Sequence, residues 1–210
     1  MSSEYKNVLT DDTTFQSLLS IEADSWKRIE EGCTTHKHDF HTPVIATVSD
    51  GIPTLRTVVL RKVWTAERKL AFHTDVRSKK IKQLGVNDAI GWLFYSSKDR
   101  IQIKLNGSVS IENNSVTTKE SWQKTSCSSR KCYLAEQAPG VVSPFFTSGL
   151  PPVFEQRDPT PDESEDGYKN FAVVITQVDS MEWLWLHHKG HRRARFDYTG
   201  SALQSQWLTP

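Results

Sequence analysis

Short β-branched and apolar segments, separated by turn signals, dominate the middle of the chain and constrain its fold more than any other feature. Asp50-Gly51, a strong hairpin signal, separates the first two of these segments. Six or seven short strands with few helices are typical of an antiparallel barrel, closed or partly closed, because closure hides the strand edges. The segments predicted as strands are residues 44–48, 54–63, 69–74, 89–95, 101–111, 171–178 and 182–186.

Helices flank the predicted strands. Thr13 and Gln16 fit a capping box that starts a helix near residue 13, and Gly32 can end it. Shorter helices are expected at residues 78–84 and 118–125. The predicted fold class is therefore mainly β with flanking helices.

Length and composition fit a single domain over residues 1–210, with 37% hydrophobic residues for a core. The formal net charge of +1 argues against a nucleic-acid partner. Apolar runs fall far short of the ~20 residues that cross a bilayer, so no membrane association is expected. The polar residues 1–12 are expected to form a flexible N-terminus. Three cysteines without paired spacing favour free thiols in a reducing, cytoplasmic environment.

One segment has a different composition from the rest. Residues 151–167 hold four prolines and six acidic residues against one arginine. Such a composition is typical of a solvated loop. We therefore expect an acidic, proline-rich insertion between the fifth and sixth predicted strands, and no domain boundary.

A candidate phosphate site begins on the run Arg56-Thr57-Val58-Val59-Leu60-Arg61. Alone, this run fits an ordinary strand whose charged ends reach solvent. Downstream, Thr74 ends a predicted strand and Ser78-Lys79-Lys80 starts a predicted helix. Because a helix N-terminus offers free N–H groups and Arg and Lys add positive charge, these residues together suit an anion. The alternative for the two lysines is a solvated helix face.

These motifs resemble those of the pyridoxamine 5′-phosphate oxidase-like FMN-binding split barrels, and most closely the Alr4036-like branch. The resemblance rests on the run 56–61, on Phe72-His73-Thr74-Asp75 and on Ser78-Lys79-Lys80. It extends to Gln102 before Gly107, to Gln137, to Trp185 and Arg195 ten residues apart, and to the terminal Trp207-Leu208-Thr209-Pro210. It implies a six- to seven-stranded antiparallel split barrel that binds FMN.

The resemblance also implies roles for individual residues. The FMN phosphate would be held by Arg56, Thr74, Ser78, Lys79 and Lys80. The remaining cofactor-binding residues would be Thr57, Val58, Val59, Leu60, Arg61, His73, Gln102, Gln137, Trp185 and Arg195. Because the family shares this pocket between two subunits, the implied assembly is a homodimer with FMN at the subunit interface.

The substrate side departs from the family pattern. His73 stands where an aromatic Tyr is common, Lys79 replaces an Arg, and Arg193 replaces a His in the run His191-Arg192-Arg193. Candidate substrate-binding residues are Arg61, Trp122, Arg130, His191 and Arg193, and the last two are the candidate catalytic residues. FMN binding is therefore better supported than oxidation of pyridoxamine phosphate itself.

Other clusters favour ordinary structural roles over new chemistry. His36, His38, Asp39 and His41 match no compact zinc motif, so no metal is expected there. The second group, His187, His188 and His191, fits a turn with protruding side chains. The basic run 191–195 is a weak signal for RNA.

Two classes of function remain open. The first is an FMN-dependent oxidoreductase acting on a small amine, phosphorylated or not. The second is a protein that binds FMN without turnover, such as a carrier or sensor, or a split barrel that binds another cofactor such as haem. Fold alone does not choose between them.

Overall fold

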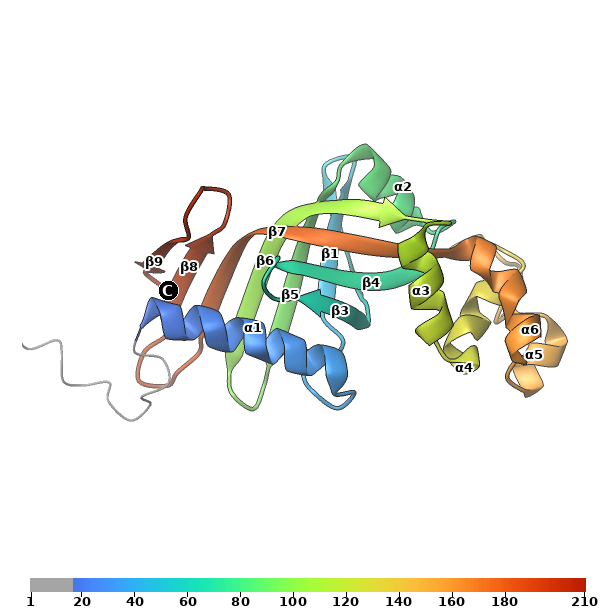
Figure 1. Cartoon of the computed structure of the whole chain (residues 1–210), viewed down its shortest axis with the longest axis horizontal. Coiled ribbons are helices and arrows are strands. Elements are labelled where there is room, and N and C mark those ends of the chain that lie inside the picture. Colours follow the sequence, from blue (N-terminus) through green and yellow to red (C-terminus); the bar gives the residue numbers. More distant parts are fainter. Residues whose placement is uncertain (1–16) are drawn as a thin grey trace, which may run out of the picture.

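The computed structural model describes residues 17–210 (Figure 1). In this range nine strands form one antiparallel sheet, with the order β2-β1-β5-β6-β7-β4-β3 and with β8 and β9 added beside β7. The strands are β1 Val44–Ser49, β2 Ile52–Thr57, β3 Leu60–Trp64, β4 Lys69–Asp75, β5 Ala89–Ser96, β6 Ile101–Glu112, β7 Phe171–Trp185, β8 Arg192–Asp197 and β9 Gln204–Leu208. The predicted mainly β, antiparallel class is confirmed.

The sheet curls because its two outer strands are neighbours in the sequence. β2 and β3 end the seven-strand path on opposite sides, yet only Val58 and Val59 separate them. The amides of Val58 and Leu60 donate to the carbonyls of Pro43 and His41, both at 3.0 Å. No ladder joins β2 to β3 among the described residues, so the sheet is not closed into a barrel. The prediction of one strand over residues 54–63 is therefore wrong, since the backbone leaves one ladder and joins another.

The C-terminal strands also differ from the prediction. Residues 171–178 and 182–186, expected as two strands, form the single strand β7. Its pairing with β6 shifts register where Asn106 faces Ser180 and Gly107 faces Val178, so that Asp179 is an extra, bulged residue. The polar Asp179-Ser180 pair resembles a turn in the sequence but sits inside this bulge. β8 and β9 were not predicted. The sequence of β8 has little apolar pattern, since it buries only Ala194 and Phe196 among charged neighbours.

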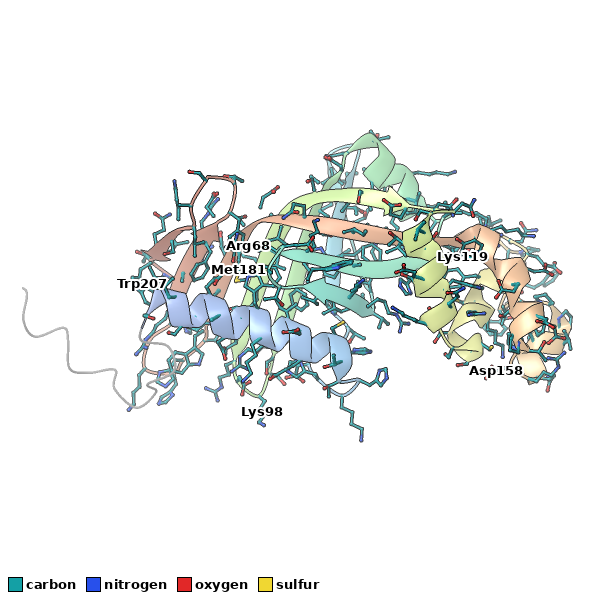
Figure 2. All side chains as sticks on the ribbon, viewed as in Figure 1. Arg68, Lys98, Lys119, Asp158, Met181 and Trp207 are labelled. Carbon is teal, nitrogen blue, oxygen red and sulfur yellow. The ribbon has the colours of Figure 1, made fainter. Side chains whose placement is uncertain are left out.

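The helix α1, Leu18–Thr34, covers the inner face of the sheet (Figure 1). Ser17 caps it, and Ile21, Trp26 and Ile29 are buried in the main core. The predicted start near residue 13, with its Thr13 and Gln16 capping box, and the expected flexible residues 1–12 lie outside the described residues. Figure 2 shows Arg68 and Met181 beside the N-terminal half of α1, where Arg68 also lies 4.2 Å from the centre of the Tyr198 ring.

A second, smaller core lies at the other end of the sheet. It contains Ala71, Trp122, Tyr133, Phe171 and Val173. The helices at this end are α3 Val116–Lys124, α4 Cys127–Arg130, α5 Pro152–Gln156 and α6 Pro161–Ser164, with 3-10 turns at Lys131–Leu134 and Glu165–Asn170. The helix α2, Lys79–Val86, instead packs against β1 and adds Leu84 to the main core. The helices predicted at 78–84 and 118–125 are thus confirmed as α2 and α3 within two residues at each end.

The acidic segment 151–167 is mostly exposed, as its composition suggested, but it is not an irregular loop. It forms α5, α6 and part of a 3-10 turn, and it packs on the second core with Ser164 fully buried. Arg130 anchors it by donating from Nη1 to Ser164 Oγ at 3.0 Å and to Glu165 Oε1 at 2.8 Å. The Thr160 side chain caps α6 by accepting from the Glu163 amide, and the Glu163 carboxylate accepts from the Thr160 amide in return. This local capping orders the segment, although its sequence has no hydrophobic pattern that would predict a helix.

Within residues 17–210, the helices are all too short or too polar to pass through a lipid bilayer.

Gly107 offers a test of the bulged β6–β7 pairing. A Cβ at this position would lie 1.9 Å from the Gln177 carbonyl oxygen, and a backbone atom cannot move aside as a side chain can. We expect Gly107→Ala to lower the free energy of unfolding by about 3 kcal/mol, measured by urea denaturation.

Gly85→Ala is the matched control, because Gly85 lies in α2 with open space around it. This variant should be as stable as the parent or more stable by up to ~1 kcal/mol. Equal stability of the two alanine variants would contradict the close approach at Gly107.

Candidate functional site

Three of the residues predicted for the phosphate site meet where β4 ends and α2 begins. Thr74 and Ser78 are buried, and their hydroxyl oxygens lie 3.4 Å apart. Lys80, in the first turn of α2, donates from Nζ to Thr74 Oγ1 at 2.8 Å and to Ser78 Oγ at 3.3 Å. The Ser78 side chain makes no capping bond to the helix. The strand-to-helix junction therefore gathers two hydroxyl groups and one ammonium group.

Arg56 approaches the same region from β2. Its Nη1 donates to Thr47 Oγ1 at 2.6 Å, and its Nη2 donates to Thr54 Oγ1 at 2.8 Å and to Gln83 Oε1 at 3.2 Å. Thr47 on β1 pairs directly with Thr54 on β2, so both hydroxyls lie on the face of the sheet that α2 covers. All three acceptors are uncharged, so they orient the guanidinium without neutralising it.

The site is positively charged. Burial lowers the pKa of Arg56. Burial, followed by the positive charge of Arg56, also lowers the pKa of Lys80, whereas the negative charge of Asp75 acts to raise it. The helix α2 links the two cations, because Gln83, which bonds Arg56, lies three residues after Lys80. The nearest acid, Asp75, is bonded by Arg77 at 2.7 Å. Across residues 17–210 neither Arg56 nor Lys80 has a carboxylate within ion-pair distance. This geometry suits an anionic ligand.

Lys79 lies apart from this group. Its side chain is exposed, and its Cε is 3.7 Å from where a Cβ on Gly140 would stand. Lys79 therefore faces the loop that follows Leu134, whereas Lys80 turns inward to Thr74. The sequence placed both lysines at the phosphate, and the helix separates them by the 100° turn between consecutive residues.

The residues expected along the isoalloxazine ring are only partly accessible. Leu60 is fully buried in the main core. The amides of Val58 and Leu60 already donate to backbone carbonyls of residues 43 and 41. Thr57 is exposed and pairs with Val44 in the β1–β2 ladder. Of this run, Thr57 and the partly exposed Val58 and Val59 can present side chains to a ligand.

His73 lies on the opposite face of β4 from Thr74, as consecutive strand residues do. Its ring contacts Phe171 of the second core, with ring centres 4.7 Å apart. Burial, and then the positive charge of Arg61, lower the pKa of His73 to about 4, so the ring is neutral at pH 7. Arg61 itself is exposed on β3. His73 and Arg61 thus belong to a different surface from the Arg56–Lys80 pair.

The other predicted ring contacts are spread over more than one surface of one chain. Gln102 pairs with Leu184, so it faces away from the neighbouring Trp185, which pairs with Ile101 and Arg192. Arg195 lines an open pocket of about 470 Å³ beside β9. Gln137 lines another of about 670 Å³ in the loop between residues 132 and 150. One chain does not bring these four side chains together.

Two of the expected substrate residues are buried in the second core. Trp122 is 2% exposed, and Arg130 lies over its ring at 4.7 Å. Arg130 also donates from Nε and Nη2 to the Trp122 carbonyl, at 3.1 and 2.8 Å. Both side chains hold α3 and the 151–170 segment together. Their burial therefore argues against the substrate contacts expected from the sequence.

The two candidate catalytic residues differ in their contacts. Arg193 donates from Nη2 to Glu182 Oε2 at 2.6 Å, and Lys104 lies 2.9 Å from the same oxygen. Burial alone would raise the pKa of Glu182, but hydrogen bonds from Arg193 and Lys104 outweigh it and lower the pKa. His191 is exposed in the turn before β8. Of the two, His191 is the one free to exchange a proton.

Sequence reasoning missed Gln83, Thr47 and Thr54, which surround Arg56. A signal for Gln83 existed, because it lies three residues after Lys80 and hence on the same side of a helix. The two threonines carried a signal as well, since a hairpin turn at Asp50-Gly51 sets Thr47 opposite Thr54.

Comparisons with known proteins agree with this architecture. Residues 23–113, which include the Arg56–Lys80 region, match the family model described as pyridoxamine 5′-phosphate oxidase, FMN-binding domain. The search of curated protein sequences returned no match. A pyridoxamine 5′-phosphate oxidase-related, FMN binding protein from Nostoc punctiforme is similar in structure, with a TM-score of 0.70 at 20% identity over 90% of this chain and 96% of that chain.

PhzG from Burkholderia lata, solved in complex with tetrahydrophenazine-1-carboxylic acid, gives a TM-score of 0.67 at 16% identity over 90% of each chain. A protein related to general stress protein 26 from Clostridium acetobutylicum gives 0.52 at 11% identity over 82% of this chain and 92% of that chain. At these identities the likeness shows the fold, which is the split barrel. The Alr4036-like branch stays a prediction.

The low pKa of His73 leads to a prediction about stability. An unfolded histidine titrates near 6.5, so between about pH 6.5 and pH 4 the unfolded chain binds a proton that the folded chain excludes. The free energy of unfolding should therefore decrease as the pH is lowered. For this group the loss is about 2 kcal/mol at pH 5 relative to pH 7. Urea denaturation of the apoprotein at both pH values measures this loss.

His73→Phe should reduce the pH-dependent loss by that amount, while His188→Phe, at an exposed histidine, should leave it unchanged. Identical pH dependence in the parent and in His73→Phe would show that His73 titrates normally in the folded protein.

Proposed function

We propose that the chain, whose residues 23–113 match the family model described as pyridoxamine 5′-phosphate oxidase, FMN-binding domain, is an FMN-dependent oxidoreductase acting on a small amine, phosphorylated or not. The observation that carries the proposal is the pair Arg56 and Lys80, two partly buried neighbouring cations with uncharged partners. The FMN phosphate is the anion that this pair fits.

The phosphate site has suitable chemistry for such a group. A phosphate dianion would accept bonds from Arg56, Lys80 and the hydroxyls of Thr74 and Ser78. Charge-assisted bonds of this kind are shorter and stronger than neutral ones. The dianion would also cancel the repulsion between the two cations, which raises its affinity further. Val58 and Val59, partly exposed between β2 and β3, would offer apolar contact to the ring system.

The bound FMN would supply two-electron redox chemistry, and the residues of the chain would position the substrate. Arg61, exposed on β3, can bind an anionic group of the substrate. Arg193 cannot act as a base, because a guanidinium stays protonated and this one is bonded to Glu182. His191 is therefore the residue we assign to proton exchange with the substrate amine.

The complete site is proposed to need two copies of the chain. Gln137, expected at the ring, lies in a loop that also exposes Val142, Phe145 and Phe146, each at least 80% exposed. Isolated chains rarely leave such side chains clustered in solvent, and a second copy would cover them. We propose a homodimer in which this loop approaches the FMN site of the partner, which would unite the ring contacts that one chain keeps apart.

A second candidate function is FMN binding without turnover, as in a carrier or sensor. The burial of Trp122 and Arg130 favours it, since these residues cannot contact a substrate. The two candidates share the phosphate site and differ only in reactivity.

Arg56→Ala tests the phosphate site. Removing one partner of a buried charged contact costs about 2–3 kcal/mol, so FMN affinity should fall about 30- to 100-fold in a fluorescence titration. Riboflavin, which lacks the phosphate, should bind both proteins equally. Lys82→Ala, at an exposed lysine of α2, also removes one positive charge and is the control. It should leave both affinities unchanged. Unchanged FMN affinity in Arg56→Ala would remove the assignment of the phosphate site.

The visible spectrum then separates the two candidate functions. An oxidoreductase should be purified yellow, lose its flavin absorbance under anaerobic addition of pyridoxamine phosphate or a related amine, and regain it in air. A protein that binds FMN tightly but is reduced by no amine and by no NAD(P)H would be the carrier or sensor.

The proposed homodimer leads to a prediction about Phe146. Phe146→Ser should shift the protein from dimer toward monomer in sedimentation velocity and weaken FMN binding in parallel, because the loop would lose a large apolar contact. Val116→Ser, at an apolar position that is 76% exposed at the start of α3, serves as control and should sediment as the parent does. A parent protein that is monomeric with FMN bound would refute the shared site.

A further inference from the structure

We propose that Gln83 is a positioning residue for phosphate recognition: its amide oxygen, together with the hydroxyls of Thr47 and Thr54, fixes the Arg56 guanidinium beside Lys80. The inference rests on the proposed FMN-phosphate site and assigns a role to a residue that would not itself touch the cofactor.

The geometry converges on one atom. Gln83 Oε1 accepts from Thr47 Oγ1 at 2.7 Å, from Thr54 Oγ1 at 3.1 Å and from Arg56 Nη2 at 3.2 Å. Arg56 in turn reaches both hydroxyls, at 2.6 and 2.8 Å. Thr47 is 1% exposed, so this network is anchored at a buried position in β1. Three side chains, from β1, β2 and α2, thus define one orientation of the guanidinium.

The chemistry also fixes which way the Gln83 amide points. With Oε1 toward Arg56, the guanidinium and two hydroxyls face an acceptor. The flipped amide would set its NH2 group against the guanidinium, donor against donor, and would leave the Thr47 hydroxyl without its carbonyl partner. The amide NH2 is therefore directed away from Arg56, and the role of Gln83 toward Arg56 is that of an acceptor.

The position of Gln83 on α2 links the two cations. Lys80 and Gln83 are three residues apart and share one side of this helix. Lys80 bonds to the end of β4, while Gln83 bonds to β1 and β2. A single short helix therefore sets the spacing between the Lys80 ammonium and the Arg56 guanidinium, although Lys80 lies on α2 and Arg56 on β2.

An uncharged acceptor is the suitable group at this position. Two neighbouring cations repel each other, so without a tether Arg56 would turn toward solvent whenever no anion is bound. A carboxylate would hold it too, but would form an ion pair and cancel the charge that the phosphate needs. The glutamine carbonyl holds Arg56 and preserves its charge, which lowers the ordering cost of binding the anion.

The test measures the phosphate contribution as the ratio of the dissociation constants for riboflavin and for FMN. In Gln83→Leu this ratio should fall about tenfold, since one hydrogen bond to a charged group is lost, while riboflavin affinity stays unchanged. Gln83→Glu should lower the ratio at least as much, because its carboxylate pairs with Arg56. A residue that only stabilises α2 would weaken both ligands together, and thermal melting of each variant reports that effect.

A double-mutant cycle with Arg56→Ala completes the test. If Gln83 acts through Arg56, Gln83→Leu should have no further effect on FMN affinity in the Arg56→Ala background. Additive losses would overturn the inference, as would a Gln83→Glu variant that matches the parent ratio. If Arg56→Ala weakens FMN and Gln83→Leu does not, this inference alone fails. If Arg56→Ala leaves FMN affinity unchanged, the phosphate site and the inference fail together.

Discussion

The link between β2 and β3 is the constraint on which the site depends. Two residues, Val58 and Val59, carry the chain from one edge of the seven-strand path to the other. The sheet must therefore curl until its edges meet, and the two arginines of one short run separate onto different surfaces. Arg56 turns toward α2 and Lys80, and Arg61 stands near His73 and the second core. A continuous strand over residues 56–61 would have placed Arg56 and Arg61 in a single ladder and would not have brought Arg56 to Lys80.

The cation pair shows how the fold maintains an unfavourable charge arrangement. Partial burial of Arg56 and Lys80 disfavours their charged forms, and their mutual repulsion adds to that cost. Hydroxyls and one amide oxygen offset part of the cost through hydrogen bonds, but none removes a charge. Asp75, the acid close enough to do so, is occupied by Arg77. Arg77 therefore forms the ion pair with this carboxylate, although the charge of Asp75 still acts to raise the pKa of Lys80.

Local signals in the sequence predicted the parts of the molecule that local physics determines. The Asp50-Gly51 hairpin, the helix after Ser78 and the meeting of Thr74, Ser78 and Lys80 all follow from turn chemistry and spacing over fewer than ten residues. The sequence could not predict that residues 58 and 60 bond to residues 43 and 41, or that Asp179 is a bulge inside one long strand. Both depend on pairing between distant segments. The prediction of a loop over residues 151–167 was wrong for a related reason, since the helices of this segment depend on contacts with Arg130 and on capping by Thr160.

The ring-side residues illustrate a different limit. Gln102, Trp185, Arg195 and Gln137 match a family pattern in order and spacing, yet strand parity sends the first two to opposite faces and the last lies on an apolar loop. A pattern along one chain cannot say which copy of that chain supplies each contact. The residues proposed for the phosphate are different, because β4, α2, β1 and β2 of one chain bring all of them except Lys79 together. We therefore expect an isolated chain to retain phosphate binding and to lose contacts to the ring. Binding of the FMN phosphate would depend on the fold of one chain, and binding of the ring on the dimer.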